Sequence, residues 1–503
     1  MLASLGPMAG VAESTGPGTA AADAGHRGMR WQSLATLTTQ VLQALVTLVV
    51  AAAVGPTEFA LWGVAGVVLN AQWLIGNLGL GQALIYFRDE KRWRDAVDAA
   101  VVVSLGLGGL VVAITALAAP AIADVFGPGF DSSEVADVVR IFSLVFLFTV
   151  IAAVPQSLIE RRLDFRRRAV PEIIAAIGYA AFAFVLLALG LGVWSLIVAK
   201  VVQSGVLMCA FWVVAPDRPR FPPRPRARTA RELIGYGGVL TVGAVIGFLT
   251  GNVDTVAVGR GPGATALGAY VLAFTITQLA PTFLSMTLQR VYFPIYAGVR
   301  GDPALLRRAF AQGMRYLAIV MVPVTVGLLT IGPEALADAF GDEWRDTGPL
   351  IRVLALYGLF RGLSTSGGVL LAAVGRPGTT VWLQATALLV PAALLIPFHE
   401  SAEEIAWIFA AGQALAFVES AIFARSYWSG AVGAVARTPL IAAAAGAAAA
   451  YACLEAVPGS VDGIAAAIVF ALVVAAVLVA IDPGVRTQLA GMAERLGRTP
   501  RSG

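Results

Sequence analysis

Apolar residues run along this chain in blocks of about 20 positions, separated by short segments rich in Arg, Asp, Gly and Pro. A helix that crosses a bilayer needs roughly 20 mainly apolar residues. Because the hydrocarbon region offers no water to the backbone, such blocks form helices and not isolated strands. The pattern predicts about 14 transmembrane helices, at residues 32–54, 60–85, 96–119, 137–159, 169–190, 193–215, 232–258, 265–289, 310–331, 349–374, 379–398, 404–425, 438–457 and 461–481.

The composition agrees with this pattern and excludes a soluble domain. Hydrophobic residues make up 58% of the chain and charged residues 13%, with a mean hydropathy of +0.80. A soluble domain carries about 25% charged residues. The two cysteines, Cys209 and Cys453, lie in apolar blocks and imply no disulfide framework. Residues 1–29 lack the apolar core of a signal peptide, so we expect a disordered cytoplasmic tail, with Met29 as an alternative start.

The charges of the loops predict the orientation in the membrane. With the N-terminus in the cytoplasm, about 28 of the 35 basic residues fall on the inner side and about four on the outer side. The outer segments are acidic instead, as in "GPEALADAFGDEWRD" (332–346) and "HESAEE" (399–404). This distribution follows the positive-inside rule. It predicts an even number of spans with both termini in the cytoplasm.

Two sequence similarities indicate an internal repeat. "ADVFG" (123–127) recurs as "ADAFG" (337–341), and "GPTEFALWGVA" (55–65) resembles "GPGATALGAYVLA" (261–273) at an offset near 206. Both pairs fall at equivalent places in two sets of six spans. Since six is even, the two sets enter the membrane in the same sense, as a parallel repeat about an axis along the membrane normal.

The expected fold is therefore an all-α polytopic membrane protein with two six-helix lobes in parallel repeat, plus two C-terminal helices. A Pro- and Arg-rich linker, "RFPPRPRAR", joins the lobes and is expected to be extended. The predicted organisation is a cytoplasmic tail (1–29), an N-lobe (30–215), the cytoplasmic basic linker (216–231), a C-lobe (232–430), two extra helices (431–482) and a second cytoplasmic tail (483–503).

The sequence lacks the residue patterns of nucleotide binding, zinc binding and triad catalysis. Neither of the two lysines, Lys91 and Lys200, stands in a nucleotide-binding GxxxxGK[ST] context. The two histidines, His26 and His399, are isolated, so neither a zinc site nor a Ser-His-Asp triad is expected. The sequence predicts a protein that is not an enzyme, with no catalytic residues, no metal site, no cofactor and no nucleic-acid partner. A repeated helical bundle instead favours a cavity between its halves.

Ionisable residues inside the spans are the candidates for function, because they are costly in a bilayer. Arg361 lies roughly 18 Å into its span, near the bilayer centre, among glycines and hydroxyl side chains. It either lines a wet cavity or forms a structural ion pair. Lys200, about seven residues from the outer end, and Glu419, about six from the inner end, are functional candidates or interfacial groups. Arg315 is expected to snorkel to the inner interface, and Glu172 to lie in the first turn of its helix.

The stretch "GFLTGNVDTVAVGR" (247–260) places Asn252 and Asp254 in an apolar helix. Asp254 lies about 22 residues after the basic linker, which is about 33 Å along a straight helix. It is therefore either a capping group near the outer interface or a carboxylate that faces the interior and pairs with a cation such as Arg361. We expect it to face the lobe interior.

Motifs along residues 30–480 resemble a known family. They include "VGPTEFALWGVA" (54–65), "LGLGQALIYFRDE" (78–90), "PQSLIERRLDFRRRAVPEI" (155–173), "GNVDTVAVGRGPGATALGAY" (251–270), "RVYFPIYAGVRGDPALLRRAF" (290–310) and "LLAAVGRP" (370–377). The chain is similar to the polysaccharide transporters, or O-antigen flippases, of the multidrug/oligosaccharidyl-lipid/polysaccharide exporter superfamily. Arg361 matches an Arg common in that family's tenth helix, and Asn252 and Asp254 match its Asn-x-Asp in the seventh. Ala52 stands where members often have an Arg.

The resemblance implies a flippase that carries oligosaccharide repeat units on undecaprenyl diphosphate across the bacterial inner membrane by alternating access, for surface polysaccharide biosynthesis. Its partners would be the lipid-linked oligosaccharide and membrane lipids, with a polysaccharide polymerase and glycosyltransferases as candidates. An Arg suits bidentate contacts with a diphosphate. Two alternatives remain. One is an H⁺- or Na⁺-coupled exporter of drugs or metabolites, with Asp254 as coupling residue. The other is a scaffold that tolerates mutation of both Asp254 and Arg361.

Overall fold

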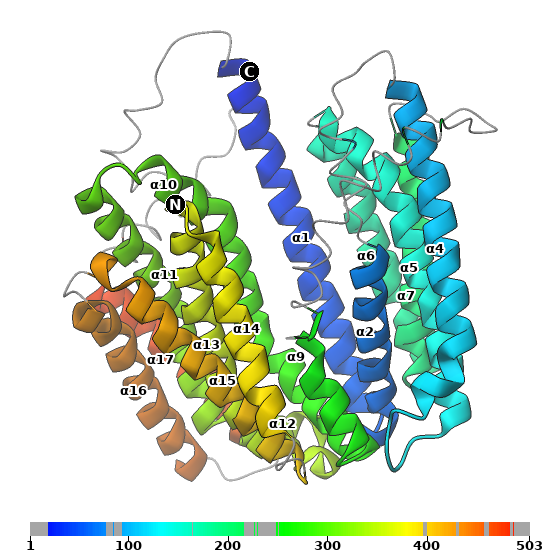
Figure 1. Cartoon of the computed structure of the whole chain (residues 1–503). Helices are drawn as coiled ribbons and strands as arrows, with labels where there is room; N and C mark the ends of the chain where they lie inside the picture. Colours follow the sequence, from blue (N-terminus) through cyan, green and yellow to red (C-terminus); the bar gives the residue numbers. More distant parts are fainter. Residues whose placement is uncertain are drawn as a thin grey trace, which may run out of the picture. The chain divides into compact units, whose positions relative to one another are not determined.

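A computed structural model describes residues 19–76, 84, 93–162, 164–215, 226, 229, 248–249, 251–395, 400–428, 432–456, 462–482 and 486 (Figure 1). All regular secondary structure in these residues is helical. The chain forms two compact units. The N-terminal unit comprises Ala20–Thr275 and Gln384–Phe409, and the C-terminal unit comprises Met1–Thr19, Ile276–Leu383 and Ala410–Gly503. These units are compact in a single conformation, and they are not defined by relative motion. The lobe boundaries expected from the sequence therefore stay a prediction.

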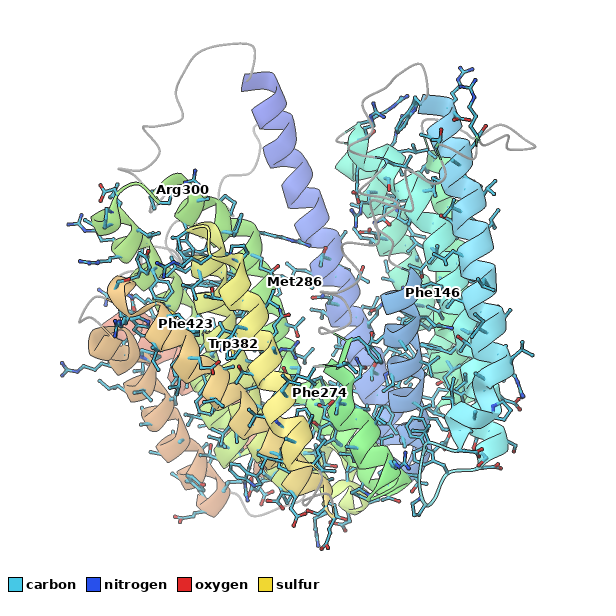
Figure 2. The ribbon with its side chains drawn as sticks, in the orientation of Figure 1. Phe146, Phe274, Met286, Arg300, Trp382 and Phe423 are labelled. Atoms are coloured by element: carbon cyan, nitrogen blue, oxygen red, sulfur yellow. The ribbon has the colours of Figure 1, made fainter. Side chains whose placement is uncertain are left out.

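The N-terminal unit is a bundle of long helices. In it, α5 packs against α2, α4 and α7, and α7 also packs against α6. The core between them is aromatic and aliphatic, with Phe142, Phe146 and Leu158 almost fully buried. Phe146 points into the bundle from α5 (Figure 2). The described helices are α1 (Thr19–Ala53), α2 (Pro56–Gly76), α4 (Trp93–Ala123), α5 (Ser132–Arg161), α6 (Phe165–Ala188), α7 (Trp194–Val214), residues 251–260 and the first part of α9 (Ala264–Thr287).

The first helix begins earlier than the hydropathy pattern indicates. α1 starts at Thr19, inside the segment 1–29 that the sequence predicts to be a disordered tail. The final part of that segment is therefore helical. Hydropathy does not detect this part, because helix formation does not require the apolar residues that define a span.

The C-terminal unit continues from the second part of α9. There α11 packs against α13 and α16, and α17 packs against α12 and α16. Arg300 lies in the turn between α10 and α11, at one end of this unit (Figure 2). Its helices are α10 (Phe293–Gly298), α11 (Pro303–Thr330), α12 (Gly332–Phe340), α13 (Thr347–Ala373), α16 (Val432–Ala456) and α17 (Asp462–Ile481); α14 (Pro377–Leu394) and α15 (Ala402–Phe423) have residues in both units.

Eleven helices in the described residues are long and apolar enough to cross a membrane. Each coincides with one of the predicted spans, which confirms a polytopic all-α membrane protein. The other three predicted spans are 60–85, 232–258 and 379–398. Parts of these three spans are helical, at 56–76, 251–260 and 377–394. Most of their remaining residues lie outside the described residues. The count of fourteen therefore stays a prediction.

Two expected loops contain helix. The helix predicted to end at 289 continues through a π-helical turn (Leu288–Tyr292) and α10 to Gly298. Tyr296 holds this extension, because its ring is buried against Phe310. The acidic segment 332–346 contains α12, whose Leu336 is buried. Hydropathy missed both, because α10 with six residues and α12 with nine are much shorter than the apolar block that defines a span.

The repeated segments pack directly on one another within the N-terminal unit. α2 and α9 begin at the two similar motifs, and a side chain at Gly268 of α9 would collide with the Pro56 carbonyl oxygen of α2. Likewise a methyl group on Gly63 would meet the Val271 Cγ2 atom at 2.5 Å. Backbone hydrogen bonds join the adjacent loops, from Gly127 N–H to the Gly259 carbonyl at 2.9 Å. Small residues in the motifs therefore permit a close helix crossing.

The last described span is fixed to the C-terminal unit at both ends. At its start, the Asp338 carboxylate of α12 accepts hydrogen bonds from the Gly463 and Ile464 amides, at 2.7 and 3.3 Å. These amides are first-turn donors that no helical carbonyl can satisfy. Just after its end, Asp482 pairs with Arg315 of α11 at 2.5 Å. Arg315 therefore has a specific carboxylate partner, and the expectation that it only snorkels is incomplete.

Candidate functional site

The N-terminal unit holds a cation inside its bundle. Lys200 lies six residues into α7, about 9 Å along the helix axis. Its ammonium donates to the side-chain amide oxygen (Oε1) of Gln203 at 3.1 Å, and the same oxygen accepts from the side-chain amide of Gln43 on α1 at 3.3 Å. The ammonium also lies 5.7 Å from the centre of the Tyr179 ring, which is buried in α6. Lys200 is only partly exposed. Three helices thus contribute neutral polar groups around one positive charge.

Among the residues that the structure describes, Lys200 forms no ion pair with a carboxylate. Amide oxygens and an aromatic face stabilise an ammonium without neutralising it. An ionisable side chain in a span is a candidate for binding an ion or substrate. The Lys200 cluster therefore suits an anion.

The C-terminal unit holds a second cation near the middle of a span. Arg361 lies fourteen residues after the start of α13, about 21 Å along the axis. Its guanidinium carbon is 6.0 Å from the centre of the Tyr357 ring, on the preceding turn. Within the described residues it has no carboxylate partner. The two roles expected for Arg361, lining a cavity or forming an ion pair, stay predictions.

Polar groups without partners lie close to Arg361. The Gln278 side chain of α9 is 6% exposed, and neither its oxygen nor its nitrogen has a hydrogen-bond partner among the described residues. It lies beside Gly358 of α13, one turn before Arg361, where an added methyl group would meet the Gln278 Nε2 atom at 3.1 Å. An unsatisfied buried amide costs free energy, so it is a candidate for a group that gains a partner in another state. Sequence reasoning missed Gln278, because one glutamine in an apolar block carries no charge pattern.

Asp254 lies inside the N-terminal unit, with 1% of its surface exposed. Its carboxylate accepts from the Tyr270 hydroxyl of α9 and from the Thr255 amide, both at 2.7 Å. Asn252, 6% exposed, accepts from the Asn70 amide of α2 at 2.9 Å. Each polar group thus has a partner within the unit. The site role expected for Asn252 and Asp254 stays a prediction, and their geometry suits helix-to-helix positioning.

Glu419 occupies the last turns of α15 and is partly buried. One of its carboxyl oxygens is enclosed without a hydrogen-bond partner among the described residues. The neighbouring Ser420 packs against α13, where a side chain at Gly367 would collide with the Ser420 hydroxyl oxygen. Glu419 therefore precedes, in α15, a serine that packs on the α13 helix that carries Arg361. Its role stays a prediction.

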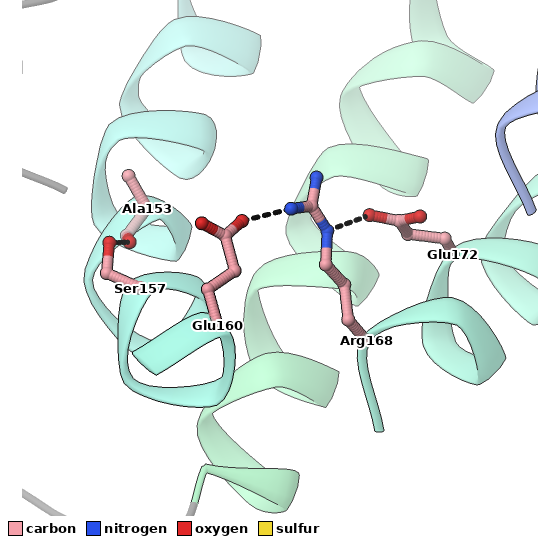
Figure 3. Close-up of polar contacts among 5 residues, drawn as sticks. All are labelled: Ala153, Ser157, Glu160, Arg168 and Glu172. Carbon is pink, nitrogen blue, oxygen red and sulfur yellow. Dashed lines mark hydrogen bonds and ion pairs between the residues drawn. The ribbon is translucent and has the colours of Figure 1, made fainter. Parts of the chain in front are cut away.

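A charged cluster that the sequence did not single out joins α5 to α6 (Figure 3). Arg168 of α6 pairs with Glu160 of α5 and, at 2.9 Å, with Glu172 one turn further along α6. Since α6 begins at Phe165, Glu172 lies beyond the first turn, and the expected first-turn position is wrong. The Arg161 guanidinium stacks over the Trp93 ring at 3.7 Å and ties α5 to α4. These contacts, made by residues of the motif at 155–173, hold the end of α5 against the start of α6 and against α4.

No group of three or more His, Cys, Asp and Glu that could hold a metal ion occurs in the described part of the chain. The chemistry that the structure does offer is electrostatic and hydrogen-bonding: an ammonium, a guanidinium and unsatisfied amides within spans. Such groups can form electrostatic contacts and hydrogen bonds with an anionic, hydroxyl-rich molecule. The fold and these groups define a polytopic helical membrane protein with ionisable groups inside its spans.

Comparison with known proteins identifies the family. Residues 49–349 match the family described as "Polysaccharide biosynthesis protein", and the chain belongs to that family. The teichuronic acid biosynthesis protein TuaB of Bacillus subtilis is 25% identical over 390 residues, which cover 76% of this chain and 78% of TuaB. The lipopolysaccharide biosynthesis protein WzxC of Escherichia coli is 23% identical over 354 residues, which cover 69% of this chain and 70% of WzxC.

Solved structures confirm the fold. The lipid II flippase MurJ, in an inward closed conformation, superposes with a TM-score of 0.72 at 12% identity, covering 89% of this chain and 98% of MurJ. An inward-facing multidrug resistance transporter of the MATE family, which is described as part of the MOP superfamily, superposes with a TM-score of 0.62 at 14% identity. The match covers 79% of this chain and 96% of the transporter. The expected all-helical fold is confirmed. Because lipid flippases and drug exporters share the fold, the fold does not select between them.

Proposed function

We propose that this protein is a flippase that translocates oligosaccharide repeat units linked to undecaprenyl diphosphate across the bacterial inner membrane, for surface polysaccharide biosynthesis. It acts by alternating access, with both termini in the cytoplasm. The observation that carries the proposal is the pair of intramembrane cations, Lys200 and Arg361, that have no carboxylate partner among the described residues. The names of the relatives, which include teichuronic acid and lipopolysaccharide biosynthesis proteins, support the same substrate class.

The two cations fit the chemistry of such a substrate. A headgroup of sugars and phosphates cannot cross hydrocarbon unaided, whereas its lipid chain remains in the bilayer. The Arg361 guanidinium offers bidentate hydrogen bonds to a diphosphate, and the Lys200 ammonium offers a point charge. The Gln278 amide has free donors and an acceptor for a hydroxyl group of the sugar. Glycosyltransferases that build the repeat unit and a polymerase that consumes it are the partners that such a step requires.

An exporter of cationic drugs is the second candidate, favoured by the MATE neighbour and by the enclosed carboxyl oxygen of Glu419. Two positive charges within the spans oppose it, because they repel cations in a medium of low dielectric. We therefore rank the flippase first.

Deletion of the gene distinguishes the two functions. We expect the deletion strain to lose surface polysaccharide and to accumulate lipid-linked repeat units in the cytoplasmic leaflet, with unchanged sensitivity to cationic drugs. Complementation with the intact gene restores the polysaccharide. Normal polysaccharide together with increased drug sensitivity would overturn the proposal in favour of the exporter.

A further inference from the structure

At one end of the C-terminal unit, two arginines from different helices occupy neighbouring positions. Arg307, in the second turn of α11, donates from its Nε atom to the Ser426 carbonyl oxygen at 2.9 Å. Ser426 directly follows Arg425 in the short 3-10 turn (Arg425–Tyr427) after α15, and both arginines are exposed. Two guanidinium groups that share one small surface repel each other, and an anion bound between them removes this repulsion.

No carboxylate neutralises this pair within the described residues, because neither Arg307 nor Arg425 forms an ion pair there. The acid nearest to Arg307 in the sequence, Asp302, has another role. Its carboxylate caps the start of α11, where one oxygen accepts from the Ala304 and Leu305 amides at 2.8 and 3.1 Å. The terminal nitrogens of Arg307 and the whole guanidinium of Arg425 therefore remain as donors for an anion.

The surface of α15 that leads to these arginines is apolar. Leu415, Val418 and Ile422 are exposed, at 38%, 49% and 56%. Their spacing of three and four residues places them on one face of the helix, and Arg425 follows Ile422 by three residues. Both α11 and α15 are membrane spans, so this exposed apolar face packs against lipid chains. Arg425 therefore lies where the apolar face ends, at the level of the lipid headgroups on the predicted cytoplasmic side.

Trp428 marks the same level. Its ring packs edge-on against Phe310 of α11, with the ring centres 5.7 Å apart, and tryptophans are enriched where lipid meets water. We propose that Arg307 and Arg425 bind the phosphate of an anionic phospholipid from the predicted cytoplasmic leaflet, with the upper part of one acyl chain along Ile422. Guanidinium groups suit a phosphate, because each offers parallel N–H donors. An anionic lipid is favoured over a zwitterionic one, because its headgroup carries no cation that offsets the phosphate. The proposal is independent of the transported substrate.

The test uses the full-length protein in nanodiscs of equal parts phosphatidylglycerol and phosphatidylcholine. The nanodiscs contain no lipid-linked oligosaccharide, so the transported substrate cannot occupy the site. A photo-crosslinking benzoylphenylalanine replaces Ile422 or, as a matched control, Leu440 of α16, which is 51% exposed and lies three residues after the exposed Arg437. Mass spectrometry measures the ratio of phosphatidylglycerol to phosphatidylcholine in the adducts. We expect a ratio about five-fold higher at position 422 than at position 440, because the proposed site has one basic residue more and each contributes about that factor near an anionic lipid.

Three variants make the result specific. Arg425→Gln removes a side chain that has no hydrogen-bond partner among the described residues, and it should lower the ratio at position 422 about five-fold. Arg425→Lys keeps the charge and should retain most of the ratio. Arg376→Gln removes an exposed arginine that follows α13 in the same unit, and it should leave the ratio unchanged. Equal ratios at positions 422 and 440, or equal effects of Arg425→Gln and Arg376→Gln, would overturn the proposal.

Discussion

The side-chain hydroxyl oxygens of Thr57 and Thr265 lie 2.7 Å apart, and the two threonines are 208 positions apart in the sequence. Gly63 and Val271, which pack against each other further along the same helices, have the same separation. Equivalent residues of two repeats touch only where they lie close to the axis that relates the repeats. We therefore predict that the contact between α2 and α9 marks the pseudo-two-fold axis of the internal repeat, at the predicted outer end of the helices.

Alternating access requires the two repeats to separate at one end of this axis and then at the other. We expect the variant with Thr57→Cys and Thr265→Cys to form a disulfide under mild oxidant, because both side chains are exposed and already in hydrogen-bonding contact. The disulfide should reduce translocation of lipid-linked repeat units about ten-fold or more, since the cross-linked repeats cannot separate at the outer end. A reductant should restore it. Translocation is measured in proteoliposomes, with the substrate's exposure followed at the outer leaflet.

This experiment needs a background without Cys209 and Cys453, the two cysteines of the chain. Each single cysteine variant, Thr57→Cys or Thr265→Cys, serves as a control and should be insensitive to the oxidant. Full translocation by a protein that is quantitatively cross-linked would show that these helices stay together during transport.

Arg361 gives the second prediction. Arg361→Ala should reduce surface polysaccharide to less than about a tenth of normal, because the loss of a charge-assisted contact within the membrane costs one or more factors of ten. Arg361→Lys should recover part of it, since an ammonium keeps the charge but not the bidentate geometry. Arg352→Gln is a matched control on the same helix, because that arginine is half exposed and lies 3.7 Å from Glu334. The polysaccharide is measured per copy of membrane-inserted protein, and a normal amount in Arg361→Ala would remove Arg361 from the site.

Lys200 gives the third prediction. Lys200→Gln keeps a polar side chain next to Gln203 and removes the charge, so we expect the protein to insert normally and to bind lipid-linked oligosaccharide about ten-fold more weakly. Lys200→Arg should retain most of the affinity. Ser204→Ala, one turn along α7, is the control, because that hydroxyl bonds to the Lys200 carbonyl of its own helix. Binding is measured by titration of detergent-solubilised protein, and equal affinities in Lys200→Gln and the parent would exclude a direct role.

The sequence predicted the parts of the structure that depend only on the order of residues along the chain. Spans follow from the hydropathy of consecutive residues, and the repeat follows from similarity at a fixed offset. The surroundings of the charges depend on lateral packing instead. Gln43 reaches Gln203 across 160 positions. Tyr270 reaches Asp254 from a neighbouring helix. Neither partner is charged, and the motif that contains Tyr270 does not show which residue it contacts, so sequence patterns identified the candidates but not their surroundings.

Asp254 gives the fourth prediction, which separates a structural role from proton or sodium coupling. Asp254→Asn keeps an oxygen that accepts from the Tyr270 hydroxyl, so we expect transport to persist. Tyr270→Phe removes one donor from the buried carboxylate and should destabilise the protein by about 1–2 kcal/mol. Thermal unfolding in detergent measures the stability, with Tyr451→Phe, half exposed on α16, as control. Complete loss of transport in a stable Asp254→Asn protein would instead support coupling through this carboxylate.

The fifth prediction concerns the ion pair between Arg315 of α11 and Asp482 at the end of α17. The Asp482 side chain is 1% exposed, whereas that of Arg315 is 47% exposed. Removing the arginine leaves a buried carboxylate without its cation, while Asp482→Asn removes the buried charge itself. We therefore expect Arg315→Gln to destabilise the protein more than Asp482→Asn does. The difference in the free energy of unfolding should be about 1–2 kcal/mol, after allowance for solvent screening of the arginine, and the unfolding temperature measures it. Arg345→Gln, whose pair with Asp342 is exposed on both sides, should have no measurable effect. If Asp482→Asn is the more destabilising change, the pair contributes net attraction that exceeds the cost of burying the carboxylate.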